Sequence, residues 1–136
     1  MSNTKPIGVA YTDQDIIGAD YIYSASELGY TSAAQGTVTQ ATSKSTTVTL
    51  NKSSGRITMN NAALAGGAAA TFTLTNSIIS VKDSIIVTIS GGATAAAYTA
   101  YVTSMTAGSA DISLRNLSAT SYSEAVIINF AIIHGQ

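Results

Sequence analysis

Hydrophobic and polar residues alternate with a period of two along several short segments of the chain. The segment "ATFTLT" places Phe72 and Leu74 on one face and three threonines on the other. The segment "ADISLR" likewise places Ala110, Ile112 and Leu114 on one face and polar residues on the other. Successive side chains of a β-strand point to opposite faces, so this pattern predicts strands with one face in a core and one in solvent.

Turn-forming residues divide the chain beyond residue 34 into eight predicted strands. Clusters of Gly, Asn and Ser separate the apolar segments, as they do between short strands. The Ala-rich stretch 60–70 contains two glycines, so we expect no more than a short turn there. The predicted strands cover residues 36–41, 45–51, 55–60, 69–75, 83–90, 96–104, 108–116 and 124–134. This spacing predicts an all-β fold, an eight-stranded antiparallel two-sheet sandwich that is jelly-roll-like, over residues 34–136.

Two predicted strands are apolar on both faces. Residues 85–87 are consecutive apolar residues, and Asn129 is the one polar side chain inside the last strand. A strand that is apolar on both faces must be covered twice, by its own core and by another element. That element is either the N-terminal arm or another subunit, and we predict that the last strand lies at a contact between subunits. The residues predicted to make this contact are Val126, Ile128, Phe130 and Ile132.

Residues 1–33 differ in composition and are predicted to form an extended N-terminal arm. They hold the only proline, four of the seven tyrosines and four of the seven acids, with one base, for a formal charge of −3. Tyrosine supplies a large contact area at interfaces, so we predict that the arm binds a partner. The alternatives are an arm folded on its own domain and a frayed terminus. The predicted contact residues are Tyr11, Asp13, Asp15, Tyr21 and Tyr23.

Composition narrows the classes of function. A chain of 136 residues predicts one domain, and 46% hydrophobic residues exclude a disordered polar chain. Charged residues make up 10%, against about 25% in a typical protein. The net charge of −1 provides no basic field for nucleic acid or an anionic membrane, so neither is an expected partner. A surface this poor in charge favours partial coverage by other subunits, the alternative being a monomer coated with Ser and Thr.

The chain has no cysteine, which excludes disulfides and thiolate metal sites and is consistent with synthesis in a cytoplasm. The first residues, "MSNTKPIGVAYTDQDIIG", lack the apolar segment of a secretory signal. Apolar runs such as residues 125–128 are far too short to span a bilayer. We therefore expect neither secretion nor membrane insertion.

The candidate catalytic and metal-binding residues do not form a known pattern. His134 is the only histidine, and its place at the end of the last strand is unsuited to a Ser–His–Asp triad. The acidic segment "TDQDIIGAD" lacks the oxygen ligand at the fifth position and the Glu at the twelfth that a calcium loop needs. Asp83, Asp111 and Glu124 are expected to be solvated surface acids and not a pair for glycoside hydrolysis. We predict no enzymatic activity, no metal and no cofactor.

Residues 35–134 resemble small β-sandwich virion structural proteins of tailed bacteriophages, the cyanophage-type capsid cement or decoration proteins. The segments "GTVTQATSKSTTVTLNKSSGRITMNNAALAGGAAATFTLTN" and "VTSMTAGSADISLRNLSATSYSEAVIINFAII" carry the resemblance, and "PIGVAYTDQDIIG" is similar to leaders of such proteins. The resemblance implies a non-enzymatic protein on the outer surface of the capsid, made in the host cytoplasm. It would bind the major capsid protein and stabilise the shell as a homotrimer. Similar sandwiches cap tail fibres, so a receptor-binding tip domain that recognises a cell-surface glycan is the alternative.

Overall fold

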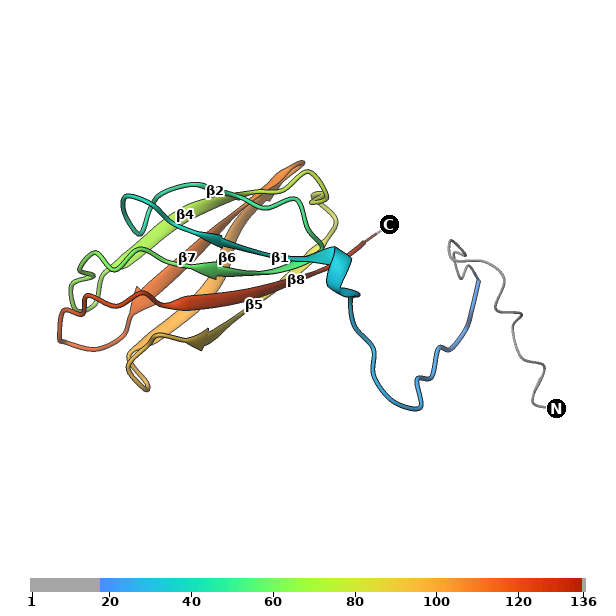
Figure 1. The fold of residues 1–136 in the computed structure, drawn as a ribbon, viewed down its shortest axis with the longest axis horizontal. Coiled ribbons are helices and arrows are strands. Elements are labelled where there is room, and N and C mark those ends of the chain that lie inside the picture. The colour runs from blue at the N-terminus through green and yellow to red at the C-terminus, as the bar shows by residue number, and fades with distance from the viewer. Residues whose placement is uncertain (1–17, 136) are drawn as a thin grey trace.

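The computed structural model describes residues 18–135, which form an arm followed by a β-sandwich (Figure 1). After the short 3-10 helix η1 (Ser32–Ala34) come the eight strands β1 (Gln35–Thr39), β2 (Val48–Thr49), β3 (Ser54–Thr58), β4 (Ala69–Thr75), β5 (Ser84–Gly91), β6 (Tyr98–Thr106), β7 (Ser109–Asn116) and β8 (Ile127–Ile133). Sheet A has the order β1-β3-β8-β5 and sheet B the order β2-β4-β7-β6. The all-β class, the two-sheet sandwich and the eight predicted strands are confirmed.

The strands are not all antiparallel, which corrects one part of the prediction. β1 pairs with β3 in parallel, and β2 pairs with β4 in parallel, whereas the other four pairs are antiparallel. Parallel neighbours cannot be joined by a tight hairpin and need a longer connection. Here the chain passes from β1 in sheet A through β2 in sheet B before it returns to β3. Alternation of side chains carries no information about the direction of the neighbouring strand.

One apolar layer between the sheets forms the core. Phe72 and Leu74 of β4 are 2% and 0% exposed, as their inward position in "ATFTLT" predicts. Ile112 and Leu114 of the neighbouring β7 are both fully buried beside them. Each aliphatic or aromatic side chain that is fully buried contributes on the order of 1.5–3 kcal/mol to folding. Burial of this layer therefore supplies most of the driving force for the sandwich.

The predicted subunit-contact residues belong to this core. Val126 and the inward-facing residues of β8, which are Ile128, Phe130 and Ile132, are between 0% and 3% exposed. Side chains already enclosed between the sheets cannot also contact another subunit, so that prediction is wrong. The outward face of β8 instead carries Ile127, Asn129, Ala131 and Ile133. A shift of one residue exchanges the two faces of a strand, and the sequence of β8 is apolar on both.

Paired glycines let the core approach the backbone of sheet A. Gly36 of β1 and Gly55 of β3 are partners in the sheet. A Cβ atom at Gly55 would lie 2.5 Å from Leu50 Cδ2 and 2.8 Å from Phe130 Cε1. Both distances are well below van der Waals contact, so Leu50 and Phe130 occupy the space that a side chain would need.

We predict that Gly55→Ala destabilises the sandwich, because the ring of Phe130 is held in the core and must shift. Overpacking of this kind costs on the order of 1–3 kcal/mol of unfolding free energy, which urea denaturation measures directly. Gly91→Ala in the same sheet is the matched control, since its Cβ would lie 3.6 Å from Ile127 Cδ1, an ordinary contact. Equal stability of the two variants would contradict the packing described here.

Candidate interaction surface

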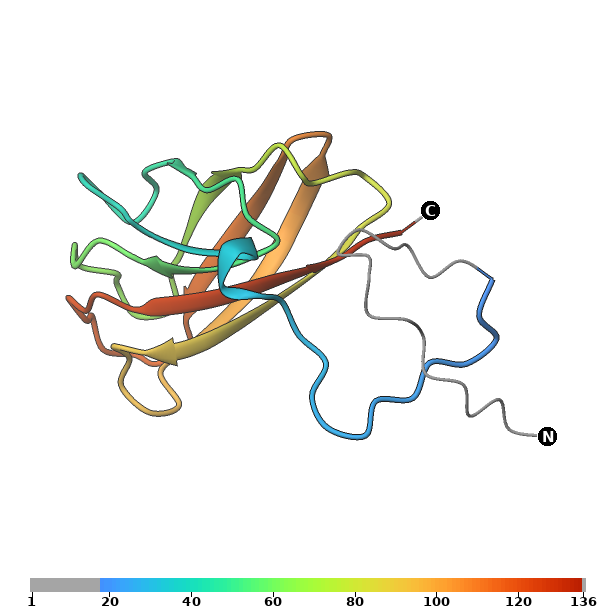
Figure 2. The same ribbon diagram turned by 45° about the vertical axis from the view of Figure 1, so that its right-hand side comes forward.

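The arm presents a dense set of exposed apolar side chains. Residues 18–31 run away from the sandwich, as Figures 1 and 2 show. Tyr21 is 77% exposed and Tyr23 87%, and their rings stack with centroids 6.0 Å apart. Ile22 and Leu28 are 65% and 91% exposed. Apolar side chains gathered on an exposed surface mark binding sites in soluble proteins.

Of the predicted contact residues of the arm, the structure describes Tyr21 and Tyr23. It brings Tyr21 and Tyr23 together in the stacked pair, and it leaves both rings exposed. Tyr11, Asp13 and Asp15 lie outside the described residues. The binding role of the arm therefore stays a prediction.

Three hydrogen bonds fix the base of the arm to the sandwich. The Tyr30 hydroxyl donates to the carbonyl oxygen of Ile132 in β8. The Gln35 side-chain amide donates to the Tyr30 carbonyl at 2.9 Å, and Lys52 Nζ donates to the Ala33 carbonyl at 2.8 Å. These contacts set the direction in which the arm leaves the body.

The outer face of sheet A is polar at its centre and apolar at one end. Thr37, Arg56 and Asn129 are neighbours in one row across β1, β3 and β8. Beside this row lies a groove of about 420 Å³. The residues that line it are Gln35, Gly36, Thr37, Ser54, Gly55, Arg56, Asn129 and Phe130. Toward the end of β8, Ile86 and Ile133 are 50% and 56% exposed.

The outer face of sheet B carries a layer of hydroxyl groups, which form hydrogen bonds with one another and with Asp111. Thr71 and Ser113 share a hydrogen bond of 2.6 Å, and Thr73 donates to Asp111 at 2.7 Å. Tyr101 is 41% exposed on β6, whereas Tyr98 is buried on the opposite face of the same strand. In the part of the sandwich that the structure describes, these two rings do not form a platform on which a sugar could stack.

His134, Asp83 and Ser80 meet at one end of the sandwich, but they do not form a catalytic triad. His134 Nδ1 lies 3.2 Å from Asp83 Oδ1, and the Ser80 hydroxyl donates to the same oxygen at 3.0 Å. In a triad the imidazole stands between the hydroxyl and the carboxylate. Here the carboxylate stands between the other two groups, so the imidazole cannot take the proton of Ser80. The cluster fastens the end of β8 to the loop before β5.

Asp83 is not the solvated acid expected from the sequence. Its side chain is 1% exposed and also accepts hydrogen bonds from the backbone N–H groups of Ser80 and Gly135. These hydrogen bonds, the one from the Ser80 backbone first, lower the pKa of Asp83 to about 2 in spite of its burial. The carboxylate lies next to a predicted strand end, but nothing in the local sequence shows that the end of β8 covers it.

A second polar cluster joins three loops at the end of the sandwich opposite the Asp83 cluster. Lys44 is 4% exposed, and its ammonium donates to the carbonyl oxygens of Asn60 and Glu124, both at 2.6 Å. Burial lowers the pKa of Lys44. The Glu124 carboxylate accepts hydrogen bonds from the hydroxyl and the backbone N–H of Thr94, which lower its pKa.

The buried Tyr98 lies close to Glu124 of the same cluster. Burial raises its pKa to about 12, and the nearby Glu124 carboxylate adds to the effect. Glu124 is therefore hydrogen-bonded within the fold while its side chain remains partly exposed to solvent. In this cluster, as in the one around Asp83, the charged groups hold loops together.

Within residues 18–135, no three His, Cys, Asp or Glu side chains gather closely enough to hold a metal ion. None of the helical segments in this range is long and apolar enough to cross a membrane.

No family model, no curated protein and no solved structure matches this chain. A proposal for its function therefore depends on the arm, on the sheet faces and on the resemblance of its sequence to phage virion proteins.

We predict that the Asp83 cluster makes the stability of the sandwich sensitive to acid. The pKa of Asp83 is about 2 in the folded protein and about 3.9 in an unfolded chain, so the unfolded state binds the proton more readily. Its contribution is present above about pH 4 and is lost as the pH falls toward 2.

Urea unfolding of the wild type and of Asp83→Asn between pH 5 and 2 measures this contribution. We expect the wild-type midpoint to fall more steeply with acid than that of Asp83→Asn. Asp20→Asn, in the exposed arm, is the matched control and should follow the wild type. The assignment would be wrong if Asp83→Asn lost as much stability with acid as the wild type does.

Proposed function

We propose that this protein is a non-enzymatic structural protein of a phage virion. In this proposal it acts as a capsid cement or decoration protein that binds the major capsid protein and stabilises the shell as a homotrimer. The observation that carries the proposal is the exposed arm, whose stacked Tyr21 and Tyr23 and neighbouring Ile22 have no contact with the body that would bury them. A segment of this kind gains stability by packing on a partner, because burial of apolar surface is the main favourable term in association.

The organisation of the chain suits attachment to a repeating lattice. The body is a sandwich whose charged clusters hold its own loops together, so the arm and the outer sheet faces remain for contact with partners. On a shell, several copies joined as an oligomer bind adjacent sites at once. Each contact can then be weak, since the second and third binding events occur at high effective concentration. The small number of charged residues is consistent with a surface that is covered on the particle.

Tyr21 and Tyr23 are the described residues that we propose contact the shell. Tyrosine is enriched at protein interfaces because its ring supplies area and its hydroxyl bonds at the rim. Tyr11, Asp13 and Asp15, in the same arm, are proposed to extend this contact, and the arm's acids would then face basic groups on the major capsid protein.

A tail-fibre or receptor-binding tip domain is the second candidate. The groove beside Arg56 and Asn129 favours it, because guanidinium and amide groups supply the hydrogen-bond donors and acceptors that a glycan needs. Copy number separates the two functions: a decoration protein repeats over the capsid lattice, whereas a fibre tip occurs a few times per particle. We expect an epitope tag to label the capsid in electron micrographs, and labelling confined to the tail would favour the tip domain.

We predict that deletion of residues 2–29 leaves the sandwich folded and abolishes binding to the shell. The deletion ends before Tyr30, so the hydrogen bonds at the base of the arm are kept. Co-sedimentation with capsid shells of the parent phage measures binding, and circular dichroism checks the fold. The full-length variant Tyr21→Ser, Tyr23→Ser is the finer test, with Ser24→Ala and Ser26→Ala as controls in the same segment. Retention of the deleted protein on shells would contradict the role of the arm.

A further inference from the structure

The outer face of sheet A ends in an exposed apolar surface close to the base of the arm. This surface, called here the apolar end, consists of Val81, Ile86, Ala131 and Ile133. Val81, Ile86 and Ile133 are 64%, 50% and 56% exposed. Ile86 and Ala131 are partners across β5 and β8, and the hydrogen bond between His134 and Asp83 brings the loop of Val81 beside the end of β8. Ile86, Ala131 and Ile133 thus share one end of the outer face of sheet A, and the exposed Val81 lies in the loop next to it.

The part of the arm formed by residues 18–29 has two different sides. Tyr21 and Tyr23 stack with nearly parallel rings, 14° apart, which places both on one side of the chain. Because side chains of an extended chain alternate, Ile22 lies on the opposite side. The arm can therefore contact one partner through its tyrosines and a second partner through Ile22, and Leu28, beyond the bend at Ala25 and Ser26, is a further exposed apolar side chain.

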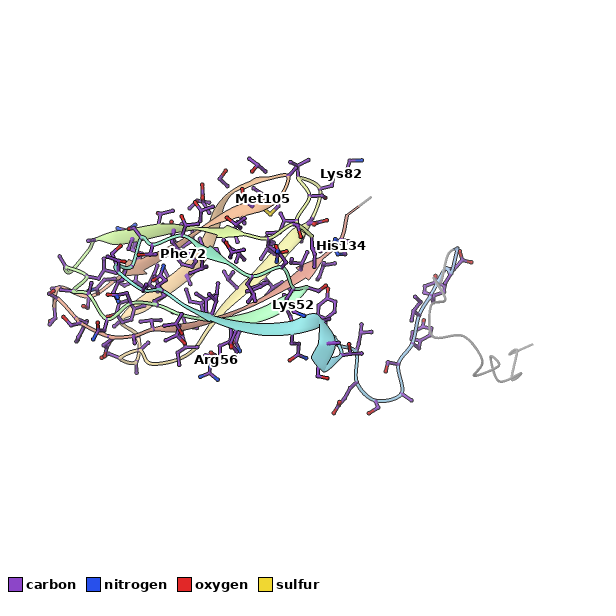
Figure 3. The ribbon with its side chains drawn as sticks, turned by 45° about the horizontal axis from the view of Figure 1, so that its top comes forward. Lys52, Arg56, Phe72, Lys82, Met105 and His134 are labelled. Carbon is purple, nitrogen blue, oxygen red and sulfur yellow. The ribbon has the colours of Figure 1, made fainter. Side chains whose placement is uncertain are left out.

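The charges of the two surfaces are complementary. The arm carries Asp20 and Glu27 in this part, whereas Lys82 adjoins Val81 in the apolar end. Figure 3 shows Lys52 and Lys82 at the end of the body from which the arm departs. Lys82 forms no ion pair with any acid within residues 18–135. An acidic, apolar segment fits this surface better than a basic one would.

The geometry favours a second copy of the chain as the source of that segment. Every residue from 18 to 29 is exposed, and the base of the arm is held in a direction that leads away from its own body (Figure 2). Twelve residues can span at most roughly 40 Å, a limit that the bends at Ala25 and Ser26 reduce. A seven-residue strand such as β8 is about 23 Å long, so the arm is long enough to extend past the edge of its own sheet.

We propose that residues 18–29 of one copy pack on the apolar end of a second copy, with Ile22 and Leu28 against Ile86 and Ile133. This inference rests on the proposed function in treating the protein as an oligomer, and it names the contact that holds the oligomer together. Each copy uses its arm once and its apolar end once, so the contact is head-to-tail and closes into a ring when the rotation between copies allows. The tyrosine side of the arm stays free to face the shell.

Engineered cysteines test this contact in the full-length protein, because the natural chain has none. Ile22→Cys in one chain and Ile86→Cys in a second, size-tagged chain are mixed and mildly oxidised. We expect a disulfide-linked heterodimer to form, since both positions are exposed and a disulfide requires Cα atoms within about 7 Å. Ile22→Cys mixed with Ala107→Cys, in the exposed turn between β6 and β7, is the matched control.

Three results would overturn the inference. They are the absence of a heterodimer, equal cross-linking to Ala107→Cys, and a disulfide within single chains of the double variant Ile22→Cys, Ile86→Cys at high dilution. The last of these would mean that the arm folds on its own body.

Light scattering on uncross-linked protein gives an independent test. We expect the wild type to have about three times the 13.8 kDa mass of one chain. The double variant Ile86→Asp, Ile133→Asp should have the mass of a single chain. Both side chains are half exposed, so the sandwich should fold, and Thr103→Asp on sheet B should leave the mass unchanged. A wild type that is a monomer at all concentrations would overturn the inference.

The two proposals fail separately. Cross-linking through Ile22 and Ile86 without any binding to shells would support the arm contact and reject the capsid function. Binding to shells without cross-linking would support the capsid function and overturn the contact between copies.

Discussion

The packing of two sheets through a single interlocked apolar layer is the constraint on which the rest of the structure depends. Ile57 and Ile128 from sheet A and Leu74 and Ile112 from sheet B are fully buried in it. Once these side chains face inward, the alternation along each strand determines what faces outward. The hydroxyl layer of sheet B and the apolar end of sheet A are both consequences of this choice, so the two outer surfaces follow from the core.

Few charged residues are present, and several of them act inside the fold. Asp83 ties the end of β8 to the loop before β5, and Lys44 ties three loops together through backbone carbonyls. Buried charges are tolerated only when hydrogen bonds replace their hydration, and in both clusters they do. The sandwich is left with a weakly charged exterior, which the proposed contact with a neighbouring copy would require.

Much of the fold could be predicted because strand position is a local property. Alternation around Phe72 and around Ile112 was enough to place β4 and β7 and to say which face is buried. The parallel pairs β1–β3 and β2–β4 could not be predicted, since strand direction depends on connections that cross between the sheets. The same limit applies to Asp83 and Glu124. Asp83 is bonded to His134, which lies 51 positions away in the chain, and Glu124 is bonded to Thr94, which lies 30 positions away.

The sequence by itself determined the all-β class, the number of strands, the distinct composition of the arm and the low charge of the surface. These follow from residue types and periodicity over a few positions. Only the tertiary structure decided which face of β8 is buried. The strand is apolar on both sides, and packing against sheet B determines which side faces the core. In the structure, the core contains Val126, Ile128, Phe130 and Ile132, whereas Ile86 and Ile133 are exposed. Contacts between segments distant in the chain, and not local pattern, determine which apolar residues remain exposed.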